Sequence, residues 1–154
     1  MPQRSVDSPI GPIRITSADG ALRALSIAAA PEPDRPGDEA LLDEATRQLG
    51  EYFAGTRTTF DLPLAPPDTP RGEALRAAIA SIRHGETLSY GALARTAGSS
   101  PRAVGQACAR NPLPIIVPCH RVLASNGIGA YSGGNGVKTK QWLLAHEAGD
   151  LWAR

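Results

Sequence analysis

Apolar and polar residues alternate along the first part of the chain, as they do in half-buried β-strands. The alternation runs from Ile10 to Thr16 and resumes at Leu22, Leu25 and Ile27. Between the two stretches lies Asp19-Gly20, a pair that favours the tight turns of β-hairpins. The sequence therefore predicts an antiparallel hairpin near the N-terminus.

Helical spacing replaces this alternation after a loop that we place at Pro31 to Gly37. Apolar residues then recur every three or four positions, which predicts an amphipathic helix with one buried face. Asp38 has a side chain suited to cap its first turn, and Gly55 is a suitable stop. A short edge strand is expected from Thr58 to Leu62. The residues assigned to the buried face of the helix are Leu41, Ala45, Leu49 and Tyr52.

Prolines crowd the middle of the chain, between Pro63 and Pro70, and predict a stiff connector. We place a domain boundary there, with an N-terminal domain at residues 1–66 and a C-terminal domain at residues 67–154. Thr69 and Pro70 are also typical of a helix cap and of the first helical position. The helix that they begin should bury a stripe formed by Leu75, Ala78, Ile79 and Ile82.

Two short helices separated by Gly98 predict a helix-turn-helix. The first should run from Ser89 to about Thr96, and the second from Ser100-Pro101 to about Arg110, where Asn111-Pro112 stops it. Such pairs bind DNA in some proteins and serve as plain packing units in others, so the pattern alone leaves both roles open.

One more helix is expected from Val137 to Ala148, with Trp142, Leu143 and Leu144 turned inward. Together these elements predict the α+β fold class. A small N-terminal α/β domain with an antiparallel sheet should precede a mostly helical C-terminal domain, which holds the helix-turn-helix and the cysteine motif described below.

Composition limits the classes of function that the chain can serve. It has 154 residues, of which 42% are hydrophobic, enough for a substantial core. No apolar stretch approaches the ~20 residues of a membrane helix, and the N-terminus lacks a signal-peptide pattern. Two cysteines are too few for a disulfide framework, and no paired spacing suggests a zinc site. We expect a cytoplasmic protein without a metal or cofactor.

The net charge of +1 hides an uneven distribution of charge. Between Thr87 and His146 there are six basic residues and no Asp or Glu. A segment free of acids suits contact with a phosphate backbone, although a chance fluctuation would produce the same pattern. The basic residues are Arg95, Arg102, Arg110, Arg121, Lys138 and Lys140.

The segment Pro118 to Val122 carries the strongest candidate for chemistry, the pair Cys119-His120. It follows the apolar, strand-like run Ile115 to Val117. Cysteine reacts as the thiolate, so a neighbouring base or positive charge activates it, and His120 and Arg121 offer one of each. The pair alone is a weak signal, because neighbours on an extended strand point to opposite faces. A turn at Cys119 would remove this difficulty.

Other motifs surround this one: Arg102-Ala103-Val104-Gly105, Asn111-Pro112-Leu113-Pro114, Tyr131-Ser132-Gly133-Gly134 and Leu143-Leu144-Ala145-His146-Glu147. In this order and near this spacing, the set closely resembles the O6-alkylguanine-DNA alkyltransferases, which repair DNA by direct reversal. The similarity extends roughly from Gln48 to Gly149. It implies a ribonuclease H-like N-terminal domain. It also implies irreversible, stoichiometric transfer of an alkyl group from O6-alkylguanine in DNA to Cys119, with O4-alkylthymine left open as a second substrate.

The resemblance implies a catalytic set of Cys119, His120, Glu147 and Asn111. Glu147 would orient the imidazole and balance its charge, and His120 would draw the thiol proton through a water. Asn111 would brace the turn that precedes the nucleophile. The product is a thioether, which water does not cleave, so the protein would react once and be spent.

The resemblance also implies binding of duplex DNA with the damaged base flipped out through the minor groove. Arg102 would fill the gap in the base stack, and Tyr90 would press on the target phosphate. Ser132 would donate a hydrogen bond towards O6, while the carbonyls of Cys119 and Val122 would accept from the guanine amino group. The full DNA- and base-binding set is Tyr90, Arg102, Ala103, Gly105, Arg110, Pro114, Val122, Tyr131, Ser132 and Gly133.

Plainer roles stand beside these. The alternatives are an ordinary phosphate contact for Arg102, a core position for Tyr90, and a solvated side chain for Glu147. Cys108 is expected to pack as a small apolar residue. The remaining histidines are expected at the surface or in loops; they are His84 and His146.

Two other functions compete with alkyl transfer. One is a non-catalytic module that flips a damaged base and recruits other repair factors; its relatives lack a nucleophile, so Cys119 argues against it. The other is a Cys-His-Glu hydrolase or acyltransferase, for which no separate oxyanion-hole motif is evident. We expect a monomer whose partner is double-stranded DNA, associated with the nucleoid when bound; cooperative binding is open.

Overall fold

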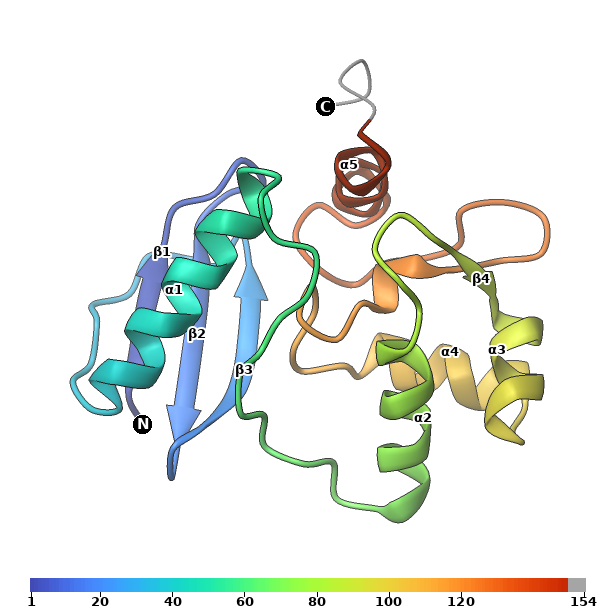
Figure 1. Cartoon of the computed structure of the whole chain (residues 1–154), viewed down its shortest axis with the longest axis horizontal. Coiled ribbons are helices and arrows are strands. Elements are labelled where there is room, and N and C mark those ends of the chain that lie inside the picture. Colours follow the sequence, from blue (N-terminus) through green and yellow to red (C-terminus); the bar gives the residue numbers. More distant parts are fainter. Residues whose placement is uncertain (150–154) are drawn as a thin grey trace. The chain divides into compact units, whose positions relative to one another are not determined.

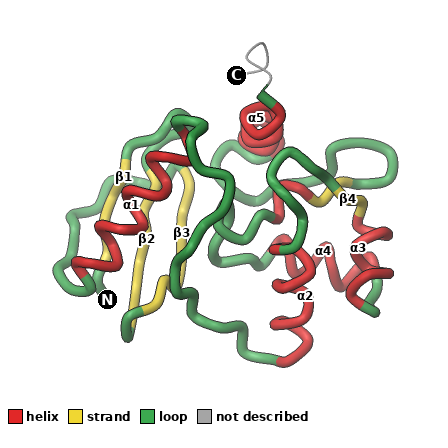
Figure 2. The backbone as a smooth tube through the Cα atoms, viewed as in Figure 1, coloured by secondary structure: helices red, strands yellow, loops and turns green. Residues whose placement is uncertain are grey.

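The computed structural model describes residues 1–149, which form two compact units divided between Ala65 and Pro66 (Figure 1). The first unit contains an antiparallel sheet covered by a helix. The second is mostly helical and contains a short parallel strand pair. Figure 2 shows the helices in red and the strands in yellow. This architecture confirms the predicted α+β fold class.

The predicted hairpin is present as β2 (Ile13–Ala18) and β3 (Ala21–Ile27). Asp19 and Gly20 join the strands with φ of 54° and 77°. Such a turn requires positive φ at both central positions, which an Asp-Gly pair tolerates. The sequence did not reveal a further strand, β1 (Gln3–Val6), which pairs antiparallel with β2 and is too short and polar to show an apolar alternation.

Helix α1 (Glu39–Phe53) packs on one face of this sheet (Figure 1). Its buried face differs slightly from the prediction, because Leu42 is buried where Leu41 was expected and Leu41 is only half-buried. Asp38 does not cap the helix with its side chain. Its carboxylate instead accepts a hydrogen bond from Ser17 Oγ at 2.8 Å. The other predicted core positions of α1 are buried: Ala45, Leu49 and Tyr52.

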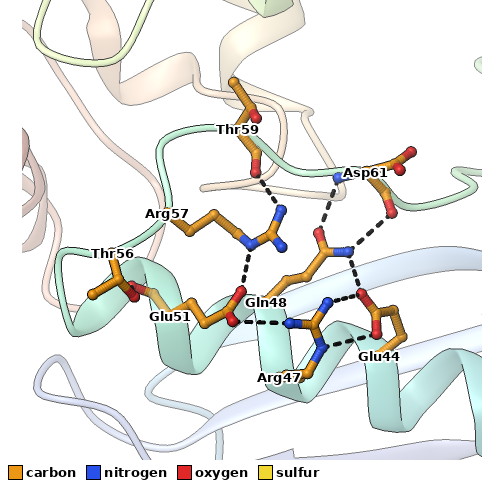
Figure 3. Close-up of polar contacts among 8 residues, drawn as sticks. All are labelled: Glu44, Arg47, Gln48, Glu51, Thr56, Arg57, Thr59 and Asp61. Carbon is orange, nitrogen blue, oxygen red and sulfur yellow. Dashed lines mark hydrogen bonds and ion pairs between the residues drawn. The ribbon is translucent and has the colours of Figure 1, made fainter.

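The predicted edge strand at Thr58 to Leu62 is wrong, and the side chain of Gln48 explains why (Figure 3). Gln48 is buried on α1; its amide nitrogen donates to the Asp61 carbonyl at 3.0 Å and its amide oxygen accepts from the Asp61 N–H at 2.9 Å. A helix side chain thus satisfies the backbone groups that a strand neighbour would otherwise pair. Just after this segment, Leu64 forms an isolated β-bridge with Leu22 of β3.

The second unit begins with α2 (Pro70–Ala80), whose first turn is capped as predicted. Thr69 Oγ1 accepts a hydrogen bond from the Gly72 N–H at 3.0 Å, and Pro70 occupies the first helical position. Leu75, Ile79 and Ile82 are buried, while Ala78 is half-buried.

The predicted helix-turn-helix consists of α3 (Tyr90–Ala97) and α4 (Pro101–Ala109). Ser89 and Ser100 cap the two helices, and each serine hydroxyl accepts a hydrogen bond from a backbone N–H three residues further on. Gly98 ends α3 with φ of 64°, a conformation that glycine adopts without strain. The helices pack against each other and against α2.

Helix α5 (Val137–Ala148) has the predicted bounds, but its inward face is more polar than predicted. Leu143 is buried, whereas Trp142 and Leu144 are only half-buried. His146 is 4% exposed and stacks on Trp142, so its expected surface position is wrong. The residues of α5 that are buried are Thr139, Lys140, Leu143, Ala145, His146 and Glu147. Two of these, Lys140 and Glu147, enter the site described next.

Within residues 1–149 no helix is both long and apolar enough to span a bilayer.

Candidate active site

Cys119 begins a one-turn 3₁₀ helix, η1 (Cys119–Arg121), so the strand-like geometry expected around it is wrong. The run before it winds through turns, with Ile115 at φ of 75° and the Val117 N–H bonded to the Leu113 carbonyl at 2.9 Å. The closely spaced prolines at positions 112, 114 and 118 account for this, because proline has no N–H to give a sheet ladder. Strand β5 (Val122–Leu123) starts only afterwards and pairs in parallel with β4 (Leu88–Ser89).

The side chain of Asn111 holds this turn and contacts the nucleophile. Its Nδ2 donates to the Val117 carbonyl at 2.8 Å and to Cys119 Sγ at 3.3 Å. Its Oδ1 accepts from the Leu113 N–H at 3.0 Å. Cys119 itself is 5% exposed, and this burial raises the pKa of its thiol. The Asn111 hydrogen bond and the charge of Lys140 act in the opposite direction, because both favour the thiolate.

His120 and Glu147 form a buried hydrogen-bonded pair, 2.7 Å between His120 Nε2 and Glu147 Oε2. Burial alone would raise the pKa of Glu147, but hydrogen bonds from His120 and Arg121 hold it well below its ordinary value. Burial lowers the pKa of His120, although Glu147 opposes this. An ionised Glu147 requires a proton on Nε2, so the neutral imidazole has its lone pair on Nδ1. That buried Nδ1 has no hydrogen-bond partner among the described residues.

Arg121 turns towards Glu147 and not towards the thiol. Its Nε and Nη2 donate to the two carboxylate oxygens at 2.7 and 2.9 Å, and its Nη1 donates to the Ile82 carbonyl at 2.7 Å. The expectation that Arg121 supplies a positive charge beside Cys119 is therefore wrong. The guanidinium instead keeps a buried carboxylate ionised, and that carboxylate fixes the tautomer of His120.

Lys140 is fully buried on α5. Its ammonium donates to the carbonyls of Val122 at 2.7 Å and Ala130 at 3.1 Å, and it lies 6.0 Å from the centre of the Tyr90 ring. Burial lowers its pKa, and the nearby thiols oppose this. Lys140 and Arg121 thus point into the protein, so assigning them to a phosphate-facing set was wrong. The exposed members of that set are Arg95, Arg102, Arg110 and Lys138.

A cavity of about 170 Å³ opens beside Cys119. Small residues of α4 and the segment around Tyr131 form most of its wall, and Tyr90 contributes from the first turn of α3. The Tyr131 hydroxyl is buried and has no hydrogen-bond partner within residues 1–149, and burial raises its pKa. Such a cavity can admit a flat, largely apolar group and bring it to the sulfur. The lining residues are Tyr90, Gly105, Cys108, Ala109, Cys119, Ala130, Tyr131 and Ser132.

Comparison with known proteins matches both units of the chain. The model of the "6-O-methylguanine DNA methyltransferase, ribonuclease-like domain" matches residues 2–66. The model of the "6-O-methylguanine DNA methyltransferase, DNA binding domain" matches residues 72–149. The chain belongs to the 6-O-methylguanine DNA methyltransferase family. This family repairs DNA by transferring methyl groups to a protein cysteine.

Similar curated proteins share this description. The methylated-DNA–protein-cysteine methyltransferase of Methanosarcina acetivorans is 39% identical, over 92% of this chain and 94% of its own length. That of Mycolicibacterium paratuberculosis is 40% identical, over 94% and 90%. Among solved structures, Mycobacterium tuberculosis OGT in complex with DNA matches with a TM-score of 0.82 and 35% identity, over 96% of this chain and 93% of that one.

The fold of this 6-O-methylguanine DNA methyltransferase family member brings together the catalytic set named from sequence, which comprises Cys119, His120, Glu147 and Asn111. It also places four of the predicted base-binding residues on the cavity wall: Tyr90, Gly105, Tyr131 and Ser132. Their roles stay predictions. Ser132 is exposed, and its hydroxyl donates to the Ala109 carbonyl at 3.4 Å.

Other predicted DNA- and base-binding residues lie outside the cavity wall. Arg102 and Ala103 are in the first turn of α4, where Arg102 is exposed. Arg110 is exposed at the end of α4. The Val122 carbonyl accepts a hydrogen bond from Lys140. The half-buried residues Pro114 and Gly133 complete the set.

Sequence reasoning missed the contributions of Lys140 and Cys108. Lys140 lies seven residues before Glu147, which places both on one face of α5 and was a usable signal. Cys108 was expected to pack as a small apolar residue, yet it lines the cavity with Cys119. Burial raises the pKa of Cys108 to about 12, so this second thiol stays protonated near neutral pH. Within the described part of the chain, no cluster of His, Cys, Asp and Glu side chains could hold a metal ion.

Proposed function

We propose that this protein repairs O6-alkylguanine in DNA by moving the alkyl group to Sγ of Cys119 in one irreversible step. A bond forms between sulfur and the alkyl carbon, and the bond between that carbon and O6 breaks. The thiol proton passes to His120, and the guanine leaves after accepting a proton. The observation that carries the proposal is the position of buried Cys119 at the wall of a cavity that the protein can offer to a base. The next residue, His120, is hydrogen-bonded to the buried carboxylate of Glu147.

The electrostatics of the site support His120 as the proton acceptor. Glu147 accepts the Nε2 proton, so Nδ1 of the neutral imidazole is free to take another. We infer that the proton travels through a bridging water from Cys119 to Nδ1. Glu147 then stabilises the imidazolium. Asn111 and Lys140 stabilise the thiolate, which offsets part of the penalty that burial imposes on it.

Residues of the cavity wall are suited to hold the base. The hydroxyls of Tyr90 and Ser132 are the candidate donors to the departing guanine. Lys140 lies beside the Tyr90 ring, where its positive charge favours negative charge that develops on the leaving group. Carbonyls of Cys119 and Val122 would accept from the amino group that guanine carries and adenine lacks at this edge. Tyr131, Gly133 and Pro114 would enclose the alkyl group.

Burial of Cys119 supports base flipping. A base stacked in a duplex cannot bring O6 to a sulfur that is 5% exposed, so the nucleotide must leave the stack. Arg102 is exposed at the start of α4, where it can enter from the minor groove and fill the gap. The small residues Ala103 and Gly105 allow α4 to approach DNA closely, and Arg110 adds positive charge. O4-alkylthymine offers the same displacement chemistry as a second substrate.

Mapping of the alkylated residue tests this proposal. The full chain is incubated with a duplex that contains one O6-methylguanine, digested, and analysed by mass spectrometry. The peptide that holds Cys119 should gain the mass of one CH₂ group, while the peptide of Cys108 should not. Cys119→Ala should still bind the duplex but transfer nothing. An adduct on Cys108, or none at all, would overturn the proposal.

A further inference from the structure

Two residues at the active site each bury a polar atom that has no hydrogen-bond partner within residues 1–149. The atoms are Nδ1 of His120 and the hydroxyl oxygen of Tyr131. Buried polar groups in proteins are nearly always paired, so each of these atoms calls for a partner other than a protein group. The proposed transfer uses Nδ1 as the proton acceptor and the Tyr131 ring as part of the alkyl pocket. It gives the Tyr131 hydroxyl no role.

The Tyr131 hydroxyl lies close to the reacting groups. Tyr131 and Cys119 line the same cavity. Burial raises the pKa of Tyr131, and the nearby charges of Cys119 and Glu147 raise it further. The imidazole of His120 is connected to the same two groups, because it follows Cys119 in the chain and its Nε2 lies 2.7 Å from Glu147 Oε2. A hydroxyl with so high a pKa stays protonated and can donate a hydrogen bond.

A single water molecule can satisfy both atoms together with the thiol. A buried water makes about three hydrogen bonds to polar groups that otherwise lack partners. Here it would donate to the lone pair of His120 Nδ1 and accept from the Tyr131 hydroxyl and from the Cys119 S–H group. Asn111 contacts the sulfur as a donor, through its Nδ2 at 3.3 Å, so the thiol proton requires a different acceptor.

We propose that the Tyr131 hydroxyl positions the water that carries the thiol proton from Cys119 to His120. This inference rests on the proposed function and adds one residue to its proton path. The S–H bond breaks as the water oxygen gains that proton, and the water gives another of its protons to Nδ1. A thiolate and an imidazolium form, and the water is unchanged. Tyr131 then holds the water oxygen while the water donates to the thiolate, so Tyr131 is a positioning residue.

Tyr131→Phe tests this role, because it keeps the aromatic wall of the cavity and removes only the hydroxyl. Iodoacetamide alkylates Cys119 at a rate that reports thiolate formation and needs no DNA. The variant should react roughly two- to tenfold more slowly near neutral pH, the equivalent of one hydrogen bond. The midpoint of its rate against pH should also be higher, which a change in packing alone would not produce. An unchanged midpoint overturns the proposal.

Tyr52→Phe is the control, because Tyr52 lies in the N-terminal unit and outside the cavity wall. It should react with iodoacetamide at the rate and with the pH midpoint of the unaltered protein. Equal changes in the two variants would show that loss of any buried tyrosine hydroxyl affects the rate, and this too overturns the proposal.

Nitrogen NMR of protein with labelled histidine observes the acceptor of the water directly. In the neutral ring of His120, Nδ1 lacks a proton and Nε2 carries one. Tyr131→Phe should shift the Nδ1 resonance, because the water that donates to it loses its support. The Nε2 resonance should stay in place, because Glu147 holds that nitrogen. No shift at Nδ1, or equal shifts at both nitrogens through movement of the ring, would contradict the role of the hydroxyl.

Urea unfolding separates a hydroxyl that holds a water from one that is simply unpaired. An unpaired buried hydroxyl is destabilising, so its removal would raise the urea midpoint. A hydroxyl that binds water should leave the midpoint of Tyr131→Phe unchanged or lower, and a higher midpoint would refute the inference. None of these measurements involves DNA. Their failure is therefore distinguishable from failure of alkyl transfer, which the mass of the Cys119 peptide reports.

Discussion

Replacing Glu147 by glutamine tests two roles of this buried carboxylate. One is to stabilise the fold through its ion pair with Arg121, and the other is to fix the tautomer in which His120 acts as the base. Glu147 accepts hydrogen bonds from His120 at 2.7 Å and from Arg121 at 2.7 and 2.9 Å, and its side chain is 1% exposed. Glutamine has nearly the same shape. The substitution removes the negative charge. It also puts an NH₂ donor where a carboxylate oxygen accepts a hydrogen bond, so that two donors face each other.

The structure sets the size of the effect. Glu147→Gln leaves the Arg121 guanidinium buried without its counterion, and breaking such a pair costs about 3–5 kcal/mol. The loss should appear in urea unfolding at neutral pH. Glu51→Gln is the matched control, because Glu51 makes partly exposed ion pairs with Arg47 and Arg57 (Figure 3), which are worth about 0–1 kcal/mol.

A double variant separates the two roles of Glu147. Adding Arg121→Met to Glu147→Gln removes the unpaired charge and should recover at least about 1 kcal/mol of stability. It should not recover the rate of alkyl transfer, because His120 still lacks the carboxylate that fixes its tautomer. A cost below about 1 kcal/mol for Glu147→Gln, or a normal transfer rate in the double variant, would refute the reasoning.

The pH dependence of stability follows from the same pair. The pKa of Glu147 in the folded protein lies well below its unfolded value of about 4.3. The stability that the ionised carboxylate contributes is therefore complete above the unfolded pKa and is lost as the pH falls through the folded one. The difference in unfolding free energy between the unaltered protein and Glu147→Gln should shrink in this acid range. A constant difference down to strongly acid pH would contradict the assignment.

Three further predictions concern other parts of the chain. Gln48→Ala should cost about 1–3 kcal/mol in urea unfolding, because it leaves the backbone of Asp61 without its partners. Lys140→Met should slow iodoacetamide alkylation of Cys119, since it removes a charge that favours the thiolate; an unchanged rate at constant pH would contradict this. Arg102→Ala should slow transfer from an O6-methylguanine duplex but not from the free modified base, and equal losses on both substrates would argue against the finger role.

Local signals predicted the helices of the C-terminal unit well. Thr69, Ser89 and Ser100 are caps, and Gly98 ends α3, because each acts through its own side chain or backbone freedom. Leu41 and Leu42 could not be separated in the same way. The choice between adjacent leucines depends on the angle at which α1 meets the sheet, and periodicity does not fix that angle.

Long-range pairing decided what the sequence could not show. The predicted strand at Thr58 to Leu62 failed because Gln48, from α1, occupies its backbone groups. Charged residues of the acid-free stretch seemed suited to DNA, yet Arg121 finds Glu147 and Lys140 finds the Val122 carbonyl inside the protein. Residue type gives the chemistry available to a side chain, but only the fold gives the direction in which it points.

At the active site, too, the sequence predicted which residues take part but not all of their contacts. The family resemblance named Cys119, His120 and Glu147, and the fold brings His120 and Glu147 into contact. The resemblance could not reveal that Arg121 also binds Glu147, because an arginine two residues after a cysteine is more readily interpreted as a partner of the thiol. The 3₁₀ turn at Cys119 separates the directions of these consecutive side chains.

Stoichiometry tests the central claim most directly. A fixed amount of protein is mixed with increasing excess of a duplex that contains O6-methylguanine, and the repaired DNA is counted after the reaction stops. Repair should level off at one lesion per molecule of protein, with all the methyl groups as thioether on Cys119. Repair that continues beyond this plateau would mean that the sulfur releases what it accepts, which contradicts the account.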